Sequence, residues 1–164
     1  YSTGYQTTEN DFYTNYLACL AMLEKDKGIG NEYYLRDFRL KGGQYVMYFG
    51  YKVNNSPVVM SDELKEKTGM DDYIEFSASY GRVSRYKRYC VVYSCENGES
   101  LKASCDFLYA VDDVYNELDE SSEPKIDSLS LSYIDNGDNN RMSLWWIIDI
   151  EGVEYIRSSE VAAG

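Results

Sequence analysis

Several segments of this chain have a strand-like period of two in their side chains, and this pattern constrains the fold most strongly. The clearest segments are Tyr45–Val53, Tyr73–Tyr80, Leu129–Tyr133 and Met142–Ile150. A period of two places successive side chains on opposite faces of a β-strand. Met142–Ile150 is apolar on both faces, which is typical of a central strand. A short final strand is predicted at Val153–Ile156.

A helical period occurs near the start of the chain. Apolar residues recur at helical spacing from Phe12 to Leu23, and Gly28 is placed to end the helix. Thr8 and Asp11 resemble a capping box, with Asp11 in the position usually held by Glu or Gln. This segment therefore predicts an amphipathic N-terminal helix.

Asn97-Gly98 predicts the turn of a β-hairpin over Tyr89–Ala110. A two-residue Asn-Gly turn places Cys90 opposite Cys105 on a face that is mostly apolar. The other face carries Tyr89 and Tyr93 among polar residues. This second face is predicted to be either a wet binding surface or a face partly covered by a helix.

The sum of these elements predicts an α+β fold. Shorter helices are expected at Ser61–Lys67 and, as a helix or turn, at Asp112–Leu118. We expect an N-terminal amphipathic helix packed on a curved, mainly antiparallel sheet of about six to seven strands; a closed lipocalin-like β-barrel is the alternative. The length indicates a single domain, 1–164, with flexible tails at 1–7 and 158–164.

The chain contains 18 tyrosines and no histidine. The absence of histidine excludes Ser-His-Asp and Cys-His catalytic sites and a histidine-ligated zinc ion. Tyrosine offers a large, rigid contact area with a polar tip, which is typical of binding surfaces. The composition therefore favours binding over catalysis.

The net charge of −12 restricts the partners that the chain can have. A nucleic-acid backbone or an anionic membrane surface would repel it. No segment is long and apolar enough to span a membrane, so no membrane insertion is expected. Two interpretations of the acidic residues remain. In the first they keep the protein soluble, and in the second they bind a basic site on a partner protein.

Four cysteines, Cys19, Cys90, Cys95 and Cys105, are compatible with two disulfides in any of three pairings. The chain begins without Met and contains the glycosylation sequon Asn54-Asn55-Ser56. Together these features predict a secreted or cell-envelope protein.

No cofactor and no metal ion is predicted. The Asp135–Asn140 segment is rich in oxygen ligands but lacks the spacing of a calcium loop, so a solvated hairpin loop is expected. Asp149 lies in an apolar strand, where burial would raise the pKa of its carboxyl group, or at the sheet rim beside Glu151-Gly152.

Three functional hypotheses follow. The first is a non-enzymatic binding protein that recognises either a small apolar or aromatic ligand in a Tyr/Trp-lined cavity or a protein through a tyrosine-rich face. The second is an acidic inhibitor or immunity-type protein that blocks a basic site on an enzyme. The third is an enzyme of a cone-shaped α+β fold that uses a buried carboxylate such as Asp149. The predicted ligand-binding residues are Tyr48, Tyr89, Tyr93, Trp145 and Asp149.

Overall fold

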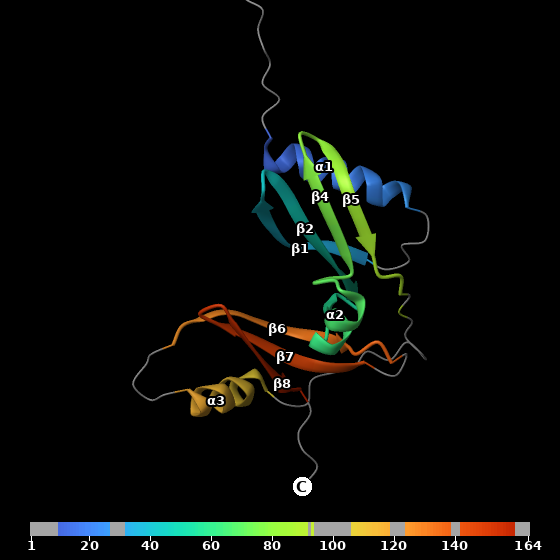
Figure 1. Ribbon diagram of the computed structural model, residues 1–164. Helices are drawn as coiled ribbons and strands as arrows, with labels where there is room; N and C mark the ends of the chain where they lie inside the picture. The colour runs from blue at the N-terminus through green and yellow to red at the C-terminus, as the bar shows by residue number, and fades with distance from the viewer. Residues whose placement is uncertain are drawn as a thin grey trace, which may run out of the picture. The chain divides into compact units, whose positions relative to one another are not determined.

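The computed structural model describes residues 10–26, 32–91, 93, 106–118, 124–138 and 142–159. These residues form an α+β fold in which an N-terminal helix packs on an open, mostly antiparallel sheet of eight strands (Figure 1). The strands follow the order β5-β4-β2-β3-β6-β7-β8, and β1 also pairs with β2. Among the described residues the end strands β5 and β8 do not pair, so the barrel alternative is wrong. The elements are α1 (Phe12–Lys25), β1 (Glu32–Lys41), β2 (Gln44–Val53), β3 (Ser56–Met60), α2 (Asp62–Thr68), β4 (Ile74–Ser79), β5 (Arg82–Arg88), α3 (Phe107–Glu117), β6 (Ile126–Asp135), β7 (Ser143–Ile150) and β8 (Val153–Ser158).

The chain divides into two compact units. Unit 1 consists of Tyr1–Tyr51 and Lys65–Val92, and unit 2 consists of Lys52–Leu64 and Tyr93–Gly164. Each unit contains a long helix beside antiparallel strands, and each is described by itself. The prediction of a single domain over 1–164 stays a prediction.

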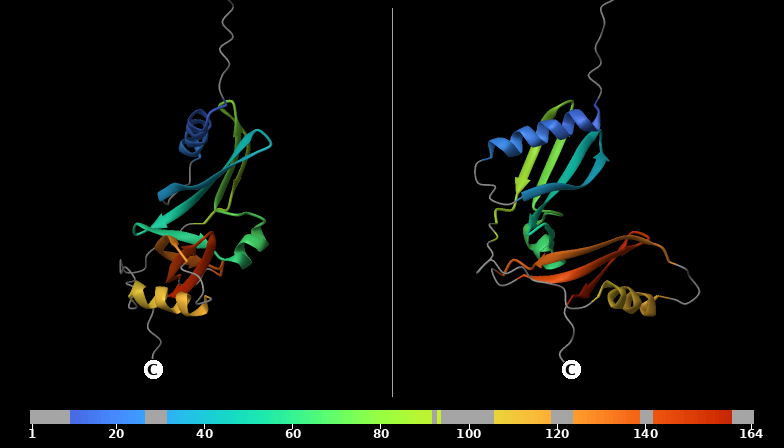
Figure 2. Two further views of the ribbon diagram at one scale, coloured as in Figure 1. Left: turned by 90° about the vertical axis from the view of Figure 1, so that its left-hand side faces the viewer. Right: turned by 180° about the vertical axis from the view of Figure 1, so that it is seen from behind.

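In unit 1, helix α1 begins at a capping aspartate. Asp11 is the N-cap, and its carboxylate accepts a hydrogen bond of 2.6 Å from the backbone N–H of Thr14. Such a cap satisfies one of the amide groups that a helix N-terminus leaves unpaired. The predicted helix is confirmed, but its ends differ: Asp11 is the N-cap itself and not the third residue of a capping box, and the helix ends at Lys25 with Asp26 as C-cap. Thr8 and Gly28 lie outside the described residues. Cys19 and Leu23 are the buried apolar residues of the helix. Its inner face lies across the strands of this unit (Figure 2), where the Tyr16 ring stacks at 6.2 Å from that of Phe49.

A buried asparagine fixes α1 to the β4–β5 turn. The Asn15 side chain accepts a hydrogen bond of 3.1 Å from the N–H of Gly81, and its amide donates to the Asn10 side chain at 2.8 Å. Asn10 in turn accepts a bond of 2.9 Å from the N–H of Tyr80. Tyr80 and Gly81 both have positive φ, as in a tight hairpin turn. The two amide side chains satisfy backbone groups of this turn.

Side chains along β2 and β4 of unit 1 alternate between a buried face and an outer face. Met47 and Phe49 of β2 are buried, and they pair with Phe76 and Ile74 of β4. Tyr48 pairs with Glu75 and therefore lies on the opposite face from the α1 contact. The predicted strand Tyr45–Val53 is confirmed as β2.

In unit 2, β7 is a central strand, as its apolar pattern predicts. It pairs antiparallel with β6 on one side and with β8 on the other, whereas β3 pairs parallel with β6. Ile147 and Ile148 are both buried although they point to opposite faces. Helix α3 covers one face by packing Ala110 and Val114 against Ile148 and the neighbouring apolar residues of this core.

The predicted hairpin over Tyr89–Ala110 is not formed in the residues that the structure describes. Tyr89, Cys90, Val91 and Tyr93 lie outside any strand, and α3 begins at Phe107. Asp106 caps that helix by accepting a bond of 3.2 Å from the N–H of Leu108. This segment forms a helix and not a strand because Ala110 and Val114, four residues apart on one side of the helix, pack against an apolar face of the sheet. The Asn97-Gly98 turn and the Cys90–Cys105 pairing involve residues outside the described part of the chain.

The remaining predictions differ from the structure in detail. The helix predicted at Ser61–Lys67 is present as α2, and Ser61 Oγ caps it by accepting a hydrogen bond of 3.2 Å from the N–H of Leu64. The sequence did not predict strands β1, β3 and β5. Ser158 ends β8 rather than opening a tail, and the buried Ser159 hydroxyl donates to the Leu144 carbonyl at 2.5 Å.

Candidate functional site

The five predicted ligand-binding residues are divided between the two units. Tyr48 and Tyr89 belong to unit 1, whereas Tyr93, Trp145 and Asp149 belong to unit 2. Within unit 1 the two tyrosines have different surroundings, because Tyr89 contacts the Tyr73 ring at 6.2 Å and Tyr73 in turn contacts the fully buried Tyr51. Neither unit by itself therefore contains the whole predicted site.

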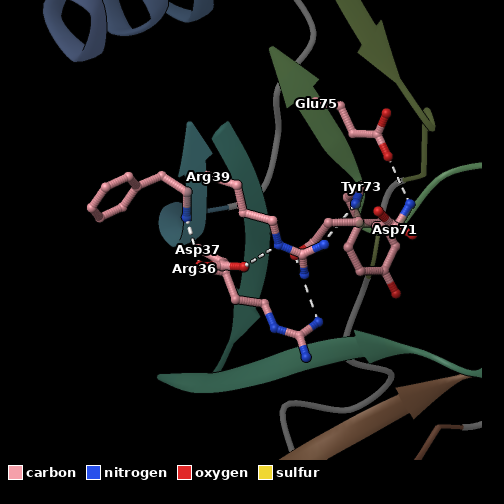
Figure 3. A network of polar contacts seen from close by, with 8 residues as sticks. Arg36, Asp37, Arg39, Asp71, Tyr73 and Glu75 are labelled. Carbon is pink, nitrogen blue, oxygen red and sulfur yellow. Dashed lines mark hydrogen bonds and ion pairs between the residues drawn. The ribbon is translucent and has the colours of Figure 1, made fainter. Parts of the chain in front are cut away.

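Figure 3 shows polar side chains of β1 (Arg36, Asp37 and Arg39) near those around the start of β4 (Asp71 and Glu75), and these residues form a polar surface. Tyr48 of β2 adjoins this surface through Arg39. The Arg39 guanidinium lies 5.2 Å from the centre of the Tyr48 ring, within the range of a cation–π contact. Burial raises the pKa of the Tyr48 hydroxyl, and the nearby Arg39 charge opposes that shift. Arginine and tyrosine are enriched among the residues that dominate binding at protein interfaces.

Most charged groups of this surface have opposite charges beside them. Arg39 pairs with Asp37 at 3.2 Å, and Lys87 lies 3.8 Å from Glu75. Arg36 lies 3.6 Å from the buried Asp72. Burial raises the pKa of the Asp72 carboxyl, although the Arg36 charge lowers it. Because these charges neutralise one another locally, the surface offers a partner little net charge.

A second polar cluster of unit 1 joins the end of α1 to β5. The Asp26 carboxylate accepts hydrogen bonds from the Tyr86 hydroxyl and from Arg88 Nη1, the latter at 2.9 Å. Arg88 Nε also donates to the Tyr51 hydroxyl at 3.3 Å. The Tyr86 and Arg88 bonds lower the pKa of Asp26, whereas burial and the Asp26 carboxylate raise that of Tyr86. The cluster fastens the C-terminus of the helix to the sheet.

We expect the Asp26 cluster to give the protein a pH-dependent stability. A carboxyl group whose pKa is lower in the folded state stabilises the fold above its unfolded value of 3.8, and this contribution disappears as the pH falls through the folded-state pKa. The free energy of unfolding should therefore be lower for Asp26→Asn at pH 7, and the difference from wild type should vanish in acid. Urea unfolding titrations at a series of pH values from 7 into the acid range measure this difference in the free energy of unfolding. Glu24→Gln, which changes an exposed carboxylate on the same helix, is the matched control and should leave the free energy of unfolding at pH 7 unchanged.

In unit 2 the predicted residues have structural contacts. The Tyr93 hydroxyl donates to the buried Asp135 carboxylate at 2.6 Å. Asp149 accepts a bond of 3.0 Å from the N–H of Gly152, so it caps the β7–β8 turn at the sheet rim. Trp145 is half-buried between Ser132 and Ser158 of the neighbouring strands. These contacts place Asp149 in the rim position that the sequence left as one of two alternatives.

The cysteines that the structure describes are free thiols. Cys19 is buried in unit 1, and burial raises the pKa of its thiol to about 12. Cys90 is exposed. No disulfide occurs among the described residues, and Cys95 and Cys105 lie outside them. Cys19 is therefore an apolar core residue of α1 in this structure.

The charge of the protein is divided unequally between the units. Unit 1 contains 11 Lys and Arg against 10 Asp and Glu, a net charge of +1. Unit 2 contains 5 Lys and Arg against 18 Asp and Glu, a net charge of −13. The two values together give the −12 of the whole chain. A partner with a positively charged surface would therefore be attracted to unit 2 and not to unit 1.

Helix α3 presents an outward face that combines aromatic and acidic side chains. Tyr109 is 71% exposed and Leu108 is 55% exposed. We define the α3 face as these two residues together with Asp112, Asp113, Tyr115 and Glu117. Arg157 forms ion pairs with two of these acidic residues. Its Nε donates a hydrogen bond of 2.5 Å to the Asp113 carboxylate. Its Nη2 lies 2.6 Å from the Glu117 carboxylate, without the geometry of a hydrogen bond.

Sequence reasoning missed the α3 face because it placed Phe107–Ala110 in a strand. The signal that indicates a helix is Asp106 as a possible N-cap followed by apolar residues four apart, Ala110 and Val114. Within the described residues, no three Cys, Asp or Glu side chains are grouped to hold a metal ion. No helix in this part of the chain is long and apolar enough to cross a membrane.

Comparison with known proteins adds no relative. No protein-family model matches the chain, and no curated protein or solved structure matches it either.

Proposed function

We propose that this is a non-enzymatic binding protein that recognises the basic surface of a partner protein through the α3 face. The observation that carries the proposal is the exposure of Tyr109 beside Asp112 on the unit that holds the net charge of −13. An exposed tyrosine ring attracts a guanidinium group, and neighbouring carboxylates pair with it. Negative charge over the whole unit would steer a basic partner toward this face.

A narrower function follows if the basic surface of the partner is the substrate site of an enzyme. The protein would then act as an acidic inhibitor, the second hypothesis drawn from the composition. The negative charge of unit 2 supports the inhibitor function as much as it supports binding to the basic surface of a partner in general. The small-ligand hypothesis has less support, since Ile147 separates Trp145 from Asp149 along β7 and the other predicted residues are distributed over both units.

The α3 face should bind an arginine-rich peptide in preference to an equally charged lysine peptide. Arginine adds planar stacking on tyrosine to the charge attraction. Replacing Tyr109 with alanine leaves the net charge unchanged, and it should raise the Kd by about threefold to tenfold through loss of the cation–π contact. NMR titration of the full chain with both peptides measures the Kd and shows which amides shift.

The matched control is Tyr80→Ala, which removes a tyrosine that is similarly exposed in unit 1. It should leave the Kd unchanged. Chemical shifts spread evenly over the acidic residues of unit 2, with no effect of Tyr109→Ala, would mean unspecific charge attraction and would contradict the proposal.

A further inference from the structure

An asparagine followed by a glycine lies directly after strand β6. Asn136 is exposed, and Gly137 has a φ of 77°. Neither residue belongs to the α3 face or to the polar surface of unit 1. An asparagine in this context can be attacked by its own chain, because the amide nitrogen of the next residue can reach the asparagine Cγ and a glycine has no side chain to block the approach. Asparagine is accordingly one of the thermolabile residues of proteins.

The fold requires a glycine at position 137 for two reasons. Its positive φ lies in the left-handed region, which residues with a side chain adopt at a cost. A β-carbon added there would also lie 2.8 Å from Leu64 Cδ1, and Leu64 is buried. The packing of unit 2 therefore retains the one residue type that leaves Asn136 most open to attack.

The structure restrains the nitrogen that would make this attack. The N–H of Gly137 donates a hydrogen bond of 2.7 Å to the buried Asp135 carboxylate. This N–H must lose its proton before the nitrogen attacks, and the negative charge of the acceptor opposes the formation of an amide anion beside it. The Tyr93 hydroxyl donates to the same carboxylate at 2.6 Å, so the acceptor is itself held in place.

We propose that Asn136-Gly137 is a site of spontaneous deamidation, and that the hydrogen bond from Gly137 to Asp135 keeps this reaction slow while unit 2 is folded. The Gly137 N–H gives its proton to hydroxide, and the nitrogen forms a bond to Asn136 Cγ. The Cγ–Nδ2 bond breaks, and ammonia leaves with a proton taken from water. Water then opens the resulting succinimide ring at either of its two C–N bonds, which gives aspartate or isoaspartate at position 136. No electron is gained or lost, and water is the only co-reactant.

The product should weaken the loop in which it forms. Either form replaces a neutral amide with a carboxylate next to Asp135 in the chain, and like charges repel. The isoaspartate form also adds a methylene group to the main chain, which displaces the Gly137 N–H from its acceptor. Unit 2 should therefore unfold at a lower urea concentration after the reaction.

Peptide mapping by mass spectrometry tests the proposal on the full chain, incubated at mildly alkaline pH with and without urea. The modified peptide gains the mass difference between –NH2 and –OH and separates into two isomers. The product at position 136 should form at least about tenfold faster in urea, since a hydrogen bond to a charged group is lost there. Asn54 and Asn55 are internal controls, because both are exposed in a turn and neither precedes a glycine. They should react far more slowly than Asn136 in urea.

Two variants examine the role of Asp135 in the folded protein. Asp135→Ala removes the acceptor and should raise the rate at position 136 by about tenfold without urea. Tyr93→Phe is the matched control, because it removes the other hydrogen bond to the same carboxylate and keeps the bond from Gly137. It should react like the wild type. Tryptophan fluorescence shows whether each variant is folded, and the comparison of wild type with and without urea holds if Asp135→Ala is not.

Three outcomes would overturn the proposal. Absence of the product at position 136 in urea would mean that this asparagine is not a deamidation site. Equal rates for the wild type with and without urea would mean that the fold gives no protection. Equal acceleration in folded Asp135→Ala and Tyr93→Phe would mean that the stability of the loop protects the site, and not the bond from Gly137. None of these results depends on whether α3 binds a basic partner.

Discussion

Replacing Phe49 with alanine should lower the free energy of unfolding of unit 1 by about 3–5 kcal/mol, the usual cost of deleting a buried phenylalanine ring. Phe49 is fully buried at the centre of β2. Its ring contacts those of Tyr16 on α1, Tyr33 on β1 and Phe76 on β4. The substitution therefore leaves a cavity where the helix meets three strands, and it should loosen α1 from the sheet.

Hydrogen exchange measured by mass spectrometry should show this loss as faster exchange in α1 and β4. The matched control is Tyr48→Ala, the neighbouring residue on the other face of the same strand. Tyr48 is only half-buried, so its loss should cost about 1 kcal/mol, as for most single substitutions. Both tryptophans lie in unit 2 and report its unfolding separately. Equal effects of the two variants would mean that α1 does not depend on the Phe49 contacts.

Replacing Asp135 with alanine should destabilise unit 2 by about 3 kcal/mol, because two hydrogen bonds to a buried carboxylate are lost. The Asp135 carboxylate accepts bonds from the N–H of Gly137 at 2.7 Å and from the Tyr93 hydroxyl at 2.6 Å. Its removal leaves both donors without this acceptor. Urea unfolding followed by tryptophan fluorescence measures the effect, since Trp145 and Trp146 lie on the strand that pairs with β6.

Two further variants separate the contributions at Asp135. Tyr93→Phe deletes only the hydroxyl and should cost about half as much, about 1.5 kcal/mol. Asp138→Ala removes an exposed carboxylate three residues away, and its effect should stay within about 0.5 kcal/mol. If Asp138→Ala costs as much as Asp135→Ala, the stabilisation comes from charge in this segment and not from the specific hydrogen bonds.

The candidate site was predicted only in part. The sequence singled out Tyr48, and the structure places it beside Arg39 on the sheet face opposite α1. Arg39 was not predicted, because its contact depends on the pairing of β2 with β1, a strand that the sequence did not predict. Tyr109 lies in the segment that was predicted as part of the hairpin Tyr89–Ala110, whereas its exposure on α3 follows from packing of the opposite helix side on β7.

The sequence by itself determined the elements whose pattern is local. Alternation located β2, β4, β6, β7 and β8, and helical spacing located α1, because each of these patterns can be read within one segment. The antiparallel α+β class followed from the short connections between these elements. Even the central position of β7 could be inferred, since only a strand covered on both faces tolerates apolar residues throughout.

Only the tertiary structure decided the features that depend on distant segments. A run such as Phe107–Ala110 is compatible with strand or helix, and the apolar face of β7 available to Ala110 and Val114 favours the helix. The structure groups Lys52–Leu64 with the C-terminal residues and Lys65–Val92 with the N-terminal ones, although Lys65–Val92 follows Lys52–Leu64 in the chain. That grouping reflects strand pairing across the sheet, which no local period encodes.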